Sequence, residues 1–200
     1  GDYALHTRSG DLEIGVGADA VWMDMAAPQD GRSFSEAEQE ELYAAYGLTL
    51  ADRPEGLEPQ AVSTGLMDIL LPVKDLETLE RAEQNEAQVT RLSEGYNVVG
   101  VHMFCPHTPD AAAHCRNFAP LYAIPEEAAT GTSNGALTWY LYRRGLIQAG
   151  ADNRFVQGEK MGKPSEILSR ITEDGSGIKV RVGGRALLTL KCELITGEPK

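Results

Sequence analysis

The 200-residue sequence is poor in several features that would assign it to a class directly. Its three cysteines, Cys105, Cys115 and Cys192, are too few and too uneven in number for a disulfide scaffold, and they fit a reducing, cytoplasmic setting. Only 18 Lys and Arg stand against 30 Asp and Glu, and the net charge of −12 argues against binding to a nucleic-acid backbone. No run of about 18 apolar residues occurs, so we expect no membrane-spanning helix. No strand is followed by a G-x-G-x-x-G motif, which argues against a dinucleotide-binding fold.

A metal site is not expected from the histidines and cysteines. The run from His102 to Cys115 contains several of them, but their spacing matches no zinc-finger or zincin template. Valine and phenylalanine in this run indicate a buried strand, in which Cys is commonly a small core residue. Histidines without the pattern of a catalytic base are expected to be structural, and these are His6, His102, His107 and His114.

Apolar residues make up 42% of the chain, and their patterns predict many strands around few helices, an α+β fold. Strands are expected over residues 3–8, 11–16, 20–25, two runs around Gly65 within 61–72, 97–104, 114–119, 154–158, 166–172, 177–183 and 185–194. The composition of residues 26–31 is typical of a linker. Helices are expected from the capping box of Ser35 and Glu38 to Gly47, as polar surface cover at 75–82 and 86–94, and at 133–144.

The segment from Pro125 to Leu137 is the most informative in the chain. Two adjacent carboxylates, Glu126 and Glu127, lead into Thr130-Gly131-Thr132-Ser133-Asn134-Gly135, which opens onto the last of these helices. A helix N-terminus carries unpaired N–H groups and about half a positive charge, so it can bind a small carboxylate. An acidic residue beside such a site can move a proton on the ligand. The alternative is an ordinary capped helix, with Thr132 or Ser133 as the N-cap.

Four parts of the sequence together resemble the PhzF-like isomerase and epimerase family. They follow the family's order and spacing and extend over essentially the whole chain. The parts are His6-Thr7-Arg8-Ser9-Gly10 with Val21-Trp22-Met23-Asp24, residues 117–120 with 126–135, residues 157–165, and residues 180–186.

The resemblance implies a diaminopimelate-epimerase-like fold, in which each of two domains wraps an antiparallel, barrel-like sheet around a central helix. It also implies an enzyme without cofactor or metal that isomerises or epimerises a small carboxylate or amino-acid-like substrate by proton transfer between the domains. Glu127 would be the catalytic acid or base, and the substrate-binding residues would be Thr130, Gly131, Thr132 and Ser133. The family commonly has Glu-Asp-x-x-Thr-Gly-Ser here. Glu127 and Thr132 replace its Asp and Ser and keep the functional groups, although Glu127 reaches one methylene farther.

The resemblance also implies that part of the enzyme lies outside this sequence. The family's principal acid/base glutamate and a nearby histidine precede the strand that matches Tyr3–Arg8, and nothing here aligns with them. We therefore expect residues 1–30 to be the last strands of a partial first domain. Residues 31–200 would form a complete second domain, whose final residues can return to the first.

The expected partners are a small carboxylate substrate, the missing N-terminal segment or chain, and a second copy in a homodimer. A non-catalytic carboxylate-binding or dimerisation module of the same fold is the alternative function, and a zinc-dependent hydrolase is a more distant one. Two structural predictions follow, the first from the apolar stripe of Ala136, Leu137, Tyr140 and Leu141 amid strand-rich flanks. Residues 131–144 should form a mostly buried central helix enclosed by antiparallel strands from 61–119 and 154–194. Residues 3–25 should not join the sheet of the second domain, and should instead pair with an element that this chain does not supply or leave an open edge prone to association.

Overall fold

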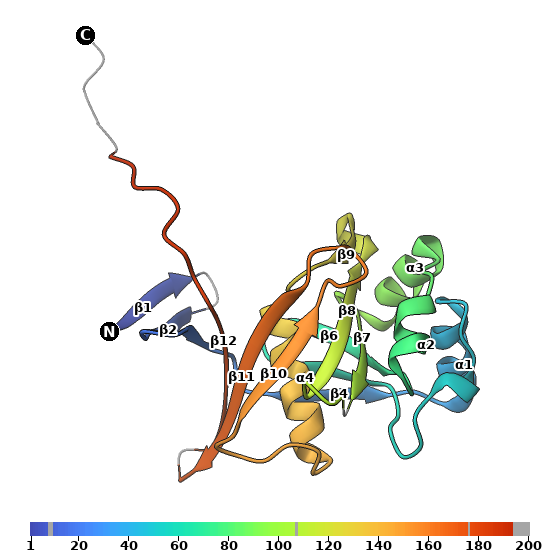
Figure 1. The fold of residues 1–200 in the computed structure, drawn as a ribbon. Coiled ribbons are helices and arrows are strands. Elements are labelled where there is room, and N and C mark those ends of the chain that lie inside the picture. The colour runs from blue at the N-terminus through green and yellow to red at the C-terminus, as the bar shows by residue number, and fades with distance from the viewer. Residues whose placement is uncertain (8–9, 107, 176, 194–200) are drawn as a thin grey trace.

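The computed structural model describes residues 1–7, 10–106, 108–175 and 177–193 (Figure 1). The strands are β1 (Asp2–Thr7), β2 (Gly10–Val16), β3 (Val21–Asp24), β4 (Gln29–Ser33), β5 (Gln60–Ser63), β6 (Met67–Pro72), β7 (Gly100–Pro106), β8 (Ala113–Ala119), β9 (Ile124–Glu127), β10 (Asp152–Gln157), β11 (Ser165–Asp174) and β12 (Gly177–Gly184). The helices are α1 (Glu36–Ala44), α2 (Leu76–Arg81), α3 (Glu86–Tyr96) and α4 (Gly131–Arg143), with short 3₁₀ turns η1 (Leu50–Asp52) and η2 (Pro120–Tyr122).

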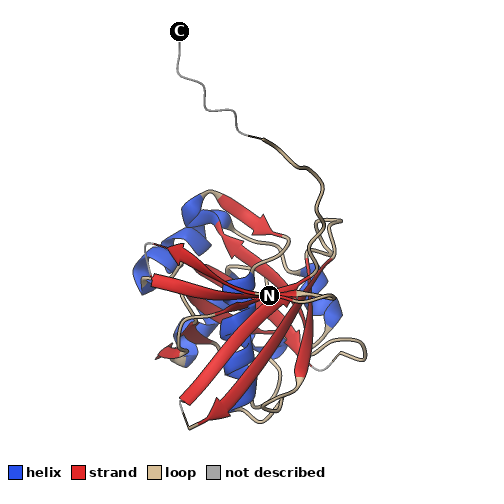
Figure 2. Cartoon of the chain, turned by 90° about the vertical axis from the view of Figure 1, so that its left-hand side faces the viewer, coloured by secondary structure: helices blue, strands red, loops and turns tan. Residues whose placement is uncertain are grey.

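The strands form one sheet that curls around α4. The strand order is β1-β2-β3-β12-β11-β10-β8-β7-β6-β5-β4, and β9 pairs with β8 beside this path. Helix α4 contacts β11 and β12 from one part of this order and β5 and β6 from another, and Figure 2 shows strands around a central helix. Its apolar residues Ala136, Leu137, Tyr140 and Leu141 are all buried. The predicted α+β fold and the predicted buried central helix are confirmed.

Two strand pairs are parallel, so the prediction that only antiparallel strands enclose the helix is wrong. Strand β6 is parallel to β7, and β8 is parallel to β10. Parallel neighbours need a crossover connection, usually through a helix. Here α2 and α3 connect β6 to β7, while β9 and α4 connect β8 to β10. The central helix is therefore also the crossover that brings β10 beside β8.

The two faces of the sheet carry separate hydrophobic cores, because side chains alternate along each strand. Helices α1, α2 and α3 cover the outer face (Figure 1), where the core includes Leu42, Tyr43, Ile69, Leu79, Val89, Met103 and Phe118. Helix α4 covers the inner face, where the core includes Leu70, Phe104, Leu137, Tyr140 and Phe155. The neighbours Ile69 and Leu70 thus lie in different cores.

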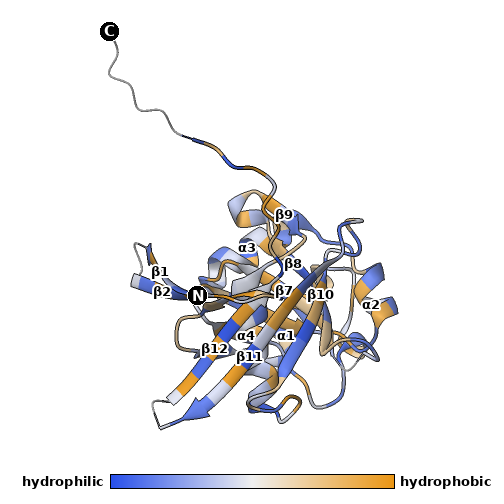
Figure 3. Ribbon diagram, turned by 60° about the vertical axis from the view of Figure 1, so that its left-hand side comes forward, coloured by the Kyte–Doolittle hydropathy of each residue, from blue (hydrophilic) through white to orange (hydrophobic). Residues whose placement is uncertain are grey.

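Side chains also alternate along β11 and β12, and the inward-facing ones cover α4. Along β12 hydrophobic and hydrophilic residues alternate (Figure 3), and along both strands buried residues alternate with more exposed ones. On β11, Ile167, Ser169 and Ile171 are buried, and on β12 the buried residues are Val180 and Val182. Every second side chain therefore faces the central helix.

Helix α1 begins as the sequence predicts. The Ser35 side chain accepts a hydrogen bond from the backbone N–H of Glu38, and the Glu38 carboxylate accepts one from the backbone N–H of Ser35 at 2.8 Å. Beyond the helix end, Gly47 adopts a φ of +66°, which favours glycine. The predicted helices 75–82 and 86–94 correspond to α2 and α3. In the described parts of the chain, no helix has the length and apolarity needed to cross a membrane.

Two segments differ from the sequence-based expectation. Residues 26–31 are not only a linker, since β4 starts within them and pairs with β5. A Cβ at Gly31 would lie 2.9 Å from the Cβ of Ala61, so the glycine that suggested a linker is required by close packing. No strand forms over residues 185–193, where Leu187, Leu188 and Leu190 are exposed, and residue 194 lies outside the described residues.

The N-terminal strands do join the main sheet, so the prediction for residues 3–25 is wrong on this point. Strand β3 pairs with β12, with Val182 opposite Met23, and β2 pairs with β3. Strand β1 pairs with β2 and is exposed at every residue. Within the described ranges its outer edge has no neighbouring strand. The predicted division at residue 30 is not tested by this pairing and stays a prediction.

Candidate active site

The side chains of Glu126 and Glu127, at the end of β9, point to opposite faces of the sheet. The Arg116 guanidinium donates to Glu126, with Nε 2.8 Å from Oε1 and Nη2 2.9 Å from Oε2. Arg116 also donates to the backbone carbonyls of Leu79 and Ala82, at 3.0 and 2.7 Å, and so fixes β9 to α2 on the outer side. Glu127, the next residue along the strand, therefore faces α4.

Thr130 orients the carboxylate of Glu127. Its Oγ1 donates to Glu127 Oε2 at 2.7 Å and accepts a hydrogen bond from Gln157 Nε2 at 3.0 Å. Thr130 is the N-cap residue of α4, but its side chain makes no cap hydrogen bond because the hydroxyl is used for Glu127. The prediction of Thr132 or Ser133 as N-cap is wrong. The helix starts at Gly131, so most of the predicted small-residue loop is its first turn.

Two buried amides hold this turn from behind. Asn134 Nδ2 donates to the backbone carbonyl of Thr130 and to Gln157 Oε1, each at 2.9 Å. Gln157 Nε2 donates to the backbone carbonyl of Glu127 at 2.7 Å. Both side chains are fully buried, and Gln157 comes from the end of β10. Because these amides are hydrogen-bonded on both sides, the segment between Glu127 and α4 is held in one conformation.

Asp68 is a buried carboxyl group beneath the first turn of α4. Ser133 Oγ donates to Asp68 Oδ2 at 2.6 Å, and the backbone N–H of Gly100 also hydrogen-bonds to Asp68. Burial raises the pKa of Asp68 to about 6, and the charge of Glu127 contributes to the increase. Sequence reasoning missed this residue. The available signal was a single carboxylate inside the apolar run Met67–Leu71.

The first turn of α4 borders a groove of about 330 Å³. Ala129, before the helix, and Gly131, at its start, line the groove, and the neighbouring strands β3 and β12 line it with Val21, Met23 and Val182. The backbone N–H groups of a helix's first turn have no partner within the helix. Of the four predicted substrate-binding residues, Gly131 lies in the groove, Thr130 supports Glu127, Thr132 is half-buried and Ser133 is turned to Asp68.

None of the three described histidines, His6, His102 and His114, lines this groove. His102 is fully buried on β7, with Nδ1 3.0 Å from Asn117 Oδ1, and burial lowers its pKa to about 4. His6 is exposed and pairs with Asp11 at 2.7 Å. His107 lies outside the described residues. Among the described residues, no group of three or more His, Cys, Asp or Glu side chains is arranged to hold a metal ion.

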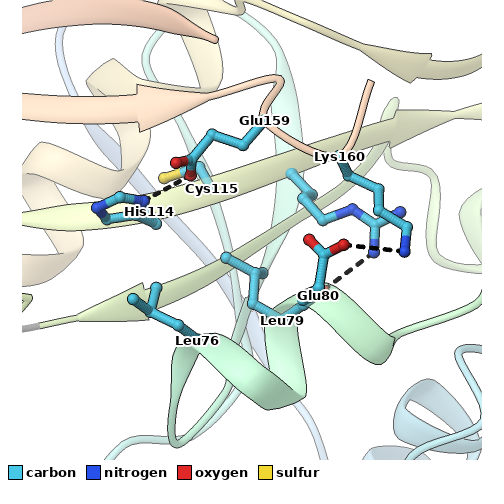
Figure 4. A pocket seen from close by; sticks show the side chains of 8 residues that line it. Leu76, Leu79, Glu80, His114, Cys115, Glu159 and Lys160 are labelled. Atoms are coloured by element: carbon cyan, nitrogen blue, oxygen red, sulfur yellow. Dashed lines mark hydrogen bonds and ion pairs between the residues drawn. The ribbon is translucent and has the colours of Figure 1, made fainter. Parts of the chain in front are cut away.

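A second cavity, of about 180 Å³, lies between α2, β8 and the loop after β10 (Figure 4). His114 lies between two carboxylates, with Nδ1 2.6 Å from Glu159 Oε2 and Nε2 3.1 Å from Asp110 Oδ1. Lys160 pairs with Glu80 at 3.1 Å. These polar groups pair with one another and hold the loop against α2, and none of the predicted site residues lines the cavity, so it is not the candidate active site.

The arrangement defines a class of protein: a curled α+β sheet around a central helix whose N-terminus adjoins an oriented carboxylate. A crystal structure of a PhzF-family phenazine biosynthesis protein from Bacillus anthracis is similar to it, with a TM-score of 0.81 and 26% identity over 92% of this chain and 64% of that one. A family model described as phenazine biosynthesis-like protein, PhzC-PhzF, matches residues 1–192. The chain belongs to this PhzC-PhzF family.

Curated relatives are longer than this chain. An uncharacterized isomerase of Deinococcus radiodurans is 34% identical over 179 residues, which are 88% of this chain and 58% of the relative. A trans-2,3-dihydro-3-hydroxyanthranilate isomerase of Pseudomonas fluorescens is 36% identical over 73 residues, which are 32% of this chain and 26% of that enzyme. The matched parts of this chain thus span less than two thirds of these relatives.

Proposed function

We propose that the chain supplies one side of an isomerase or epimerase active site, in which Glu127 moves a proton on a small carboxylate or amino-acid-like substrate. The observation that carries the proposal is the Glu127 carboxylate, oriented by Thr130 at 2.7 Å beside the N-terminus of α4. Membership of a family whose curated relatives include isomerases supports the reaction class.

The proposed binding step uses the helix N-terminus. A substrate carboxylate enters the groove beside Gly131 and meets the free N–H groups and the positive end of the α4 dipole. The hydroxyl of Thr132 adds a donor. Ser133 contributes only its backbone N–H, because its hydroxyl donates to Asp68.

The proposed chemical step is proton abstraction from a carbon near that carboxylate and return of the proton at the same or another carbon. Glu127 acts as the general acid or base. The oriented N–H groups stabilise the enolate-like charge that forms as the proton leaves. These steps require no metal or cofactor. The second acid/base group lies, in this proposal, outside the 200 residues, on a segment or chain that faces the groove.

Hydrogen exchange tests the proposal. The native gene product that contains these residues is incubated in D₂O with trans-2,3-dihydro-3-hydroxyanthranilate, and deuterium uptake and isomerisation are followed by mass spectrometry and NMR. We expect uptake at carbon and a decrease of about 10²- to 10⁴-fold in Glu127→Gln, which keeps the size and hydrogen bonding of the side chain but removes its basicity. The isolated 200-residue chain should show no turnover.

A matched control is Glu94→Gln, which removes a charge from the exposed face of α3 and should leave the rate unchanged. Equal rates in Glu127→Gln and the wild-type enzyme would show that Glu127 is only a partner of the helix dipole. Turnover by the isolated chain would contradict the need for a second acid/base group.

A further inference from the structure

Gln157 lies behind the candidate site, and two backbone groups fix the direction in which its side-chain amide points. Gln157 is fully buried at the end of β10. The backbone carbonyl of Glu127 can only accept a hydrogen bond, and it lies 2.7 Å from Gln157 Nε2. The backbone N–H of Thr130 can only donate, and its nitrogen lies 3.3 Å from Gln157 Oε1. A reversed amide would place two acceptors together on one side and two donors together on the other, so only this orientation satisfies both contacts.

A second buried amide supports the same orientation. Asn134 is fully buried, and its Nδ2 donates to Gln157 Oε1 and to the backbone carbonyl of Thr130, each at 2.9 Å. Because that carbonyl can only accept, the Asn134 amide must present its N–H groups on this side. Its Oδ1 accepts a hydrogen bond from the Cys115 thiol at 3.6 Å. The two amides therefore form a chain in which each donor and each acceptor is assigned.

The chain of amides decides what the Thr130 hydroxyl does. Gln157 Nε2 has two protons, of which one goes to the Glu127 carbonyl and the other to Thr130 Oγ1 at 3.0 Å. A hydroxyl has a single proton, and Thr130 directs it to Glu127 Oε2 at 2.7 Å. Within the described ranges of the chain, Glu127 Oε1 accepts no hydrogen bond. The two carboxylate oxygens are therefore unequal, since Oε2 is held and Oε1 is free.

We propose that Gln157 is a positioning residue of the proposed isomerase or epimerase: through Thr130 it holds Glu127 Oε2 and leaves Oε1 as the oxygen that exchanges a proton with the substrate. This inference rests on the proposed function for its role in catalysis. The hydrogen-bond chain itself is a property of the 200 residues.

The chain fits both halves of the proton-transfer cycle. When Glu127 Oε1 takes a proton from a substrate carbon, Oε2 becomes the carbonyl oxygen of a carboxylic acid and can still accept from Thr130. When Oε1 returns the proton to carbon, the carboxylate is restored with the same hydrogen bond. The amides and the hydroxyl therefore keep their orientation throughout the cycle, and the reacting oxygen stays the same.

A double-mutant cycle tests the role in catalysis. The native gene product is assayed with trans-2,3-dihydro-3-hydroxyanthranilate as Gln157→Leu, as Thr130→Val and as the double variant. Thr130→Val removes a hydrogen bond to a charged group and should lower kcat by about 10- to 150-fold, while KM changes much less. Gln157→Leu should lower kcat in the presence of Thr130. It should have little further effect in the Thr130→Val enzyme, because it acts through that hydroxyl.

The cycle separates positioning of the hydroxyl from a purely structural role. If Gln157 only fixes the backbone, Gln157→Leu lowers kcat by the same factor with or without the Thr130 hydroxyl, and that result would overturn the inference. Gln88→Leu, the same substitution on the exposed face of α3, is the matched control and should leave kcat unchanged. If Gln157→Leu does not fold, Gln157→Met takes its place, because Met has a similar length and no N–H donor.

A measurement without substrate separates the inference from the proposed reaction. In the 200-residue chain, the ¹³C NMR signal of the Glu127 carboxyl carbon near neutral pH reports on the hydrogen bond at Oε2. Gln157→Leu and Thr130→Val should move this signal in the same direction, and the double variant should move it no farther than Thr130→Val does. A shift in Thr130→Val alone would overturn the inference, whether or not the enzyme turns over. The expected shifts without turnover would count against the proposed reaction and support the hydrogen-bond chain.

Discussion

At the scale of single residues, the candidate site depends on which face of a strand each polar side chain occupies. On β9, Glu126 pairs with Arg116 on the outer face, while Glu127 faces α4 and accepts from Thr130. On β6, Asp68 lies on the inner face, where Ser133 reaches it. A slip of one residue in either strand would exchange these faces, so register defines the site as much as residue type does.

Thr132 offers a test of ligand binding by the isolated chain. Thr132→Val keeps the shape of the side chain and removes a hydroxyl donor next to Gly131, which lines the groove. A hydrogen bond contributes about 0.5–1.5 kcal/mol, so we expect binding to weaken by about 2- to 12-fold. Anthranilate can serve as the probe, with affinity measured from shifts of the amide signals of residues 129–134. Thr172→Val on β11, which does not line the groove, is the matched control. Equal weakening in both variants would contradict a specific role of the Thr132 hydroxyl in binding.

Two buried groups should give the folding stability an unusual pH dependence. The pKa of Asp68 is about 6 in the folded chain against 3.8 ordinarily, so the folded state binds more protons and stability falls as pH rises from about 4 to 6. The pKa of His102 is about 4 against 6.5, so the unfolded state binds more protons and stability rises over about pH 4 to 6.5. Each effect is on the order of 3 kcal/mol, and they nearly cancel.

Substitution of one of the two groups should reveal the pH dependence of stability that the other contributes. In Asp68→Asn, urea unfolding at several pH values should show stability that rises with pH in this window, because only the His102 effect remains. In His102→Gln the stability should fall with pH. A flat profile in Asp68→Asn would show that the pKa of His102 is not lowered by burial.

The sequence predicts part of this site and not the rest for a physical reason. Glu127 and residues 130–133 are contiguous, so a run of carboxylates and small residues before a helix could be recognised. Asp68 and Gln157 come from other strands. Each is a single polar residue whose role depends on a register that one sequence does not display. Their burial beside α4 becomes evident only when β6, β10 and α4 are assembled.

At the scale of elements, α4 shows how prediction and packing differ. The apolar stripe of the helix was sufficient to predict a buried central helix. The N-cap was misplaced by two or three residues: it is Thr130, although the Thr130 hydroxyl donates to Glu127 and does not cap the helix. Similarly, Gly31 suggested a linker by type, whereas β4 needs a glycine there against β5 and β6. At Gly31 a tertiary contact overrides the local preference of the residue.

Gly135 inside α4 should be essential for packing rather than for flexibility. A Cβ there would lie 2.7 Å from Thr64 Oγ1 and 3.3 Å from Met25 Cγ. Ala in place of Gly normally stabilises a helix interior by about 0.5–1 kcal/mol. Overpacking costs about 1–3 kcal/mol, so Gly135→Ala should lower the free energy of unfolding.

The matched control is Gly95→Ala in α3, where an added Cβ meets no atom within 4 Å. It should stabilise the chain by the normal helix preference of about 0.5–1 kcal/mol. Urea denaturation of both variants gives the comparison. Stabilisation by Gly135→Ala would show that α4 lies farther from Thr64 and Met25 than the structure places it.

At the scale of the whole molecule, the chain has a packed body and a hairpin that projects from it. Neither hydrophobic core contains a residue before Phe34, and β1 is exposed throughout. Strand β3 is different, because it pairs with β12 and places the buried Asp24 against Lys179 and Arg181, with Arg181 Nε 2.6 Å from Asp24 Oδ1. The boundary between dispensable and required structure should therefore fall between β2 and β3.

Two shortened chains test that boundary. A chain that begins at Ala20 lacks β1 and β2 and should unfold within about 4 °C of the full chain, because it loses little buried surface. A chain that begins at Pro28 also lacks β3, so it exposes the edge of β12 and leaves Arg181 without Asp24. The loss of the β3–β12 pairing and of the Asp24 ion pairs should lower the midpoint clearly more than the first deletion does. Thermal unfolding followed by circular dichroism measures both. If the first deletion lowers the midpoint as much as the second, the hairpin is part of the folded body, and the open edge of β1 has been assigned wrongly.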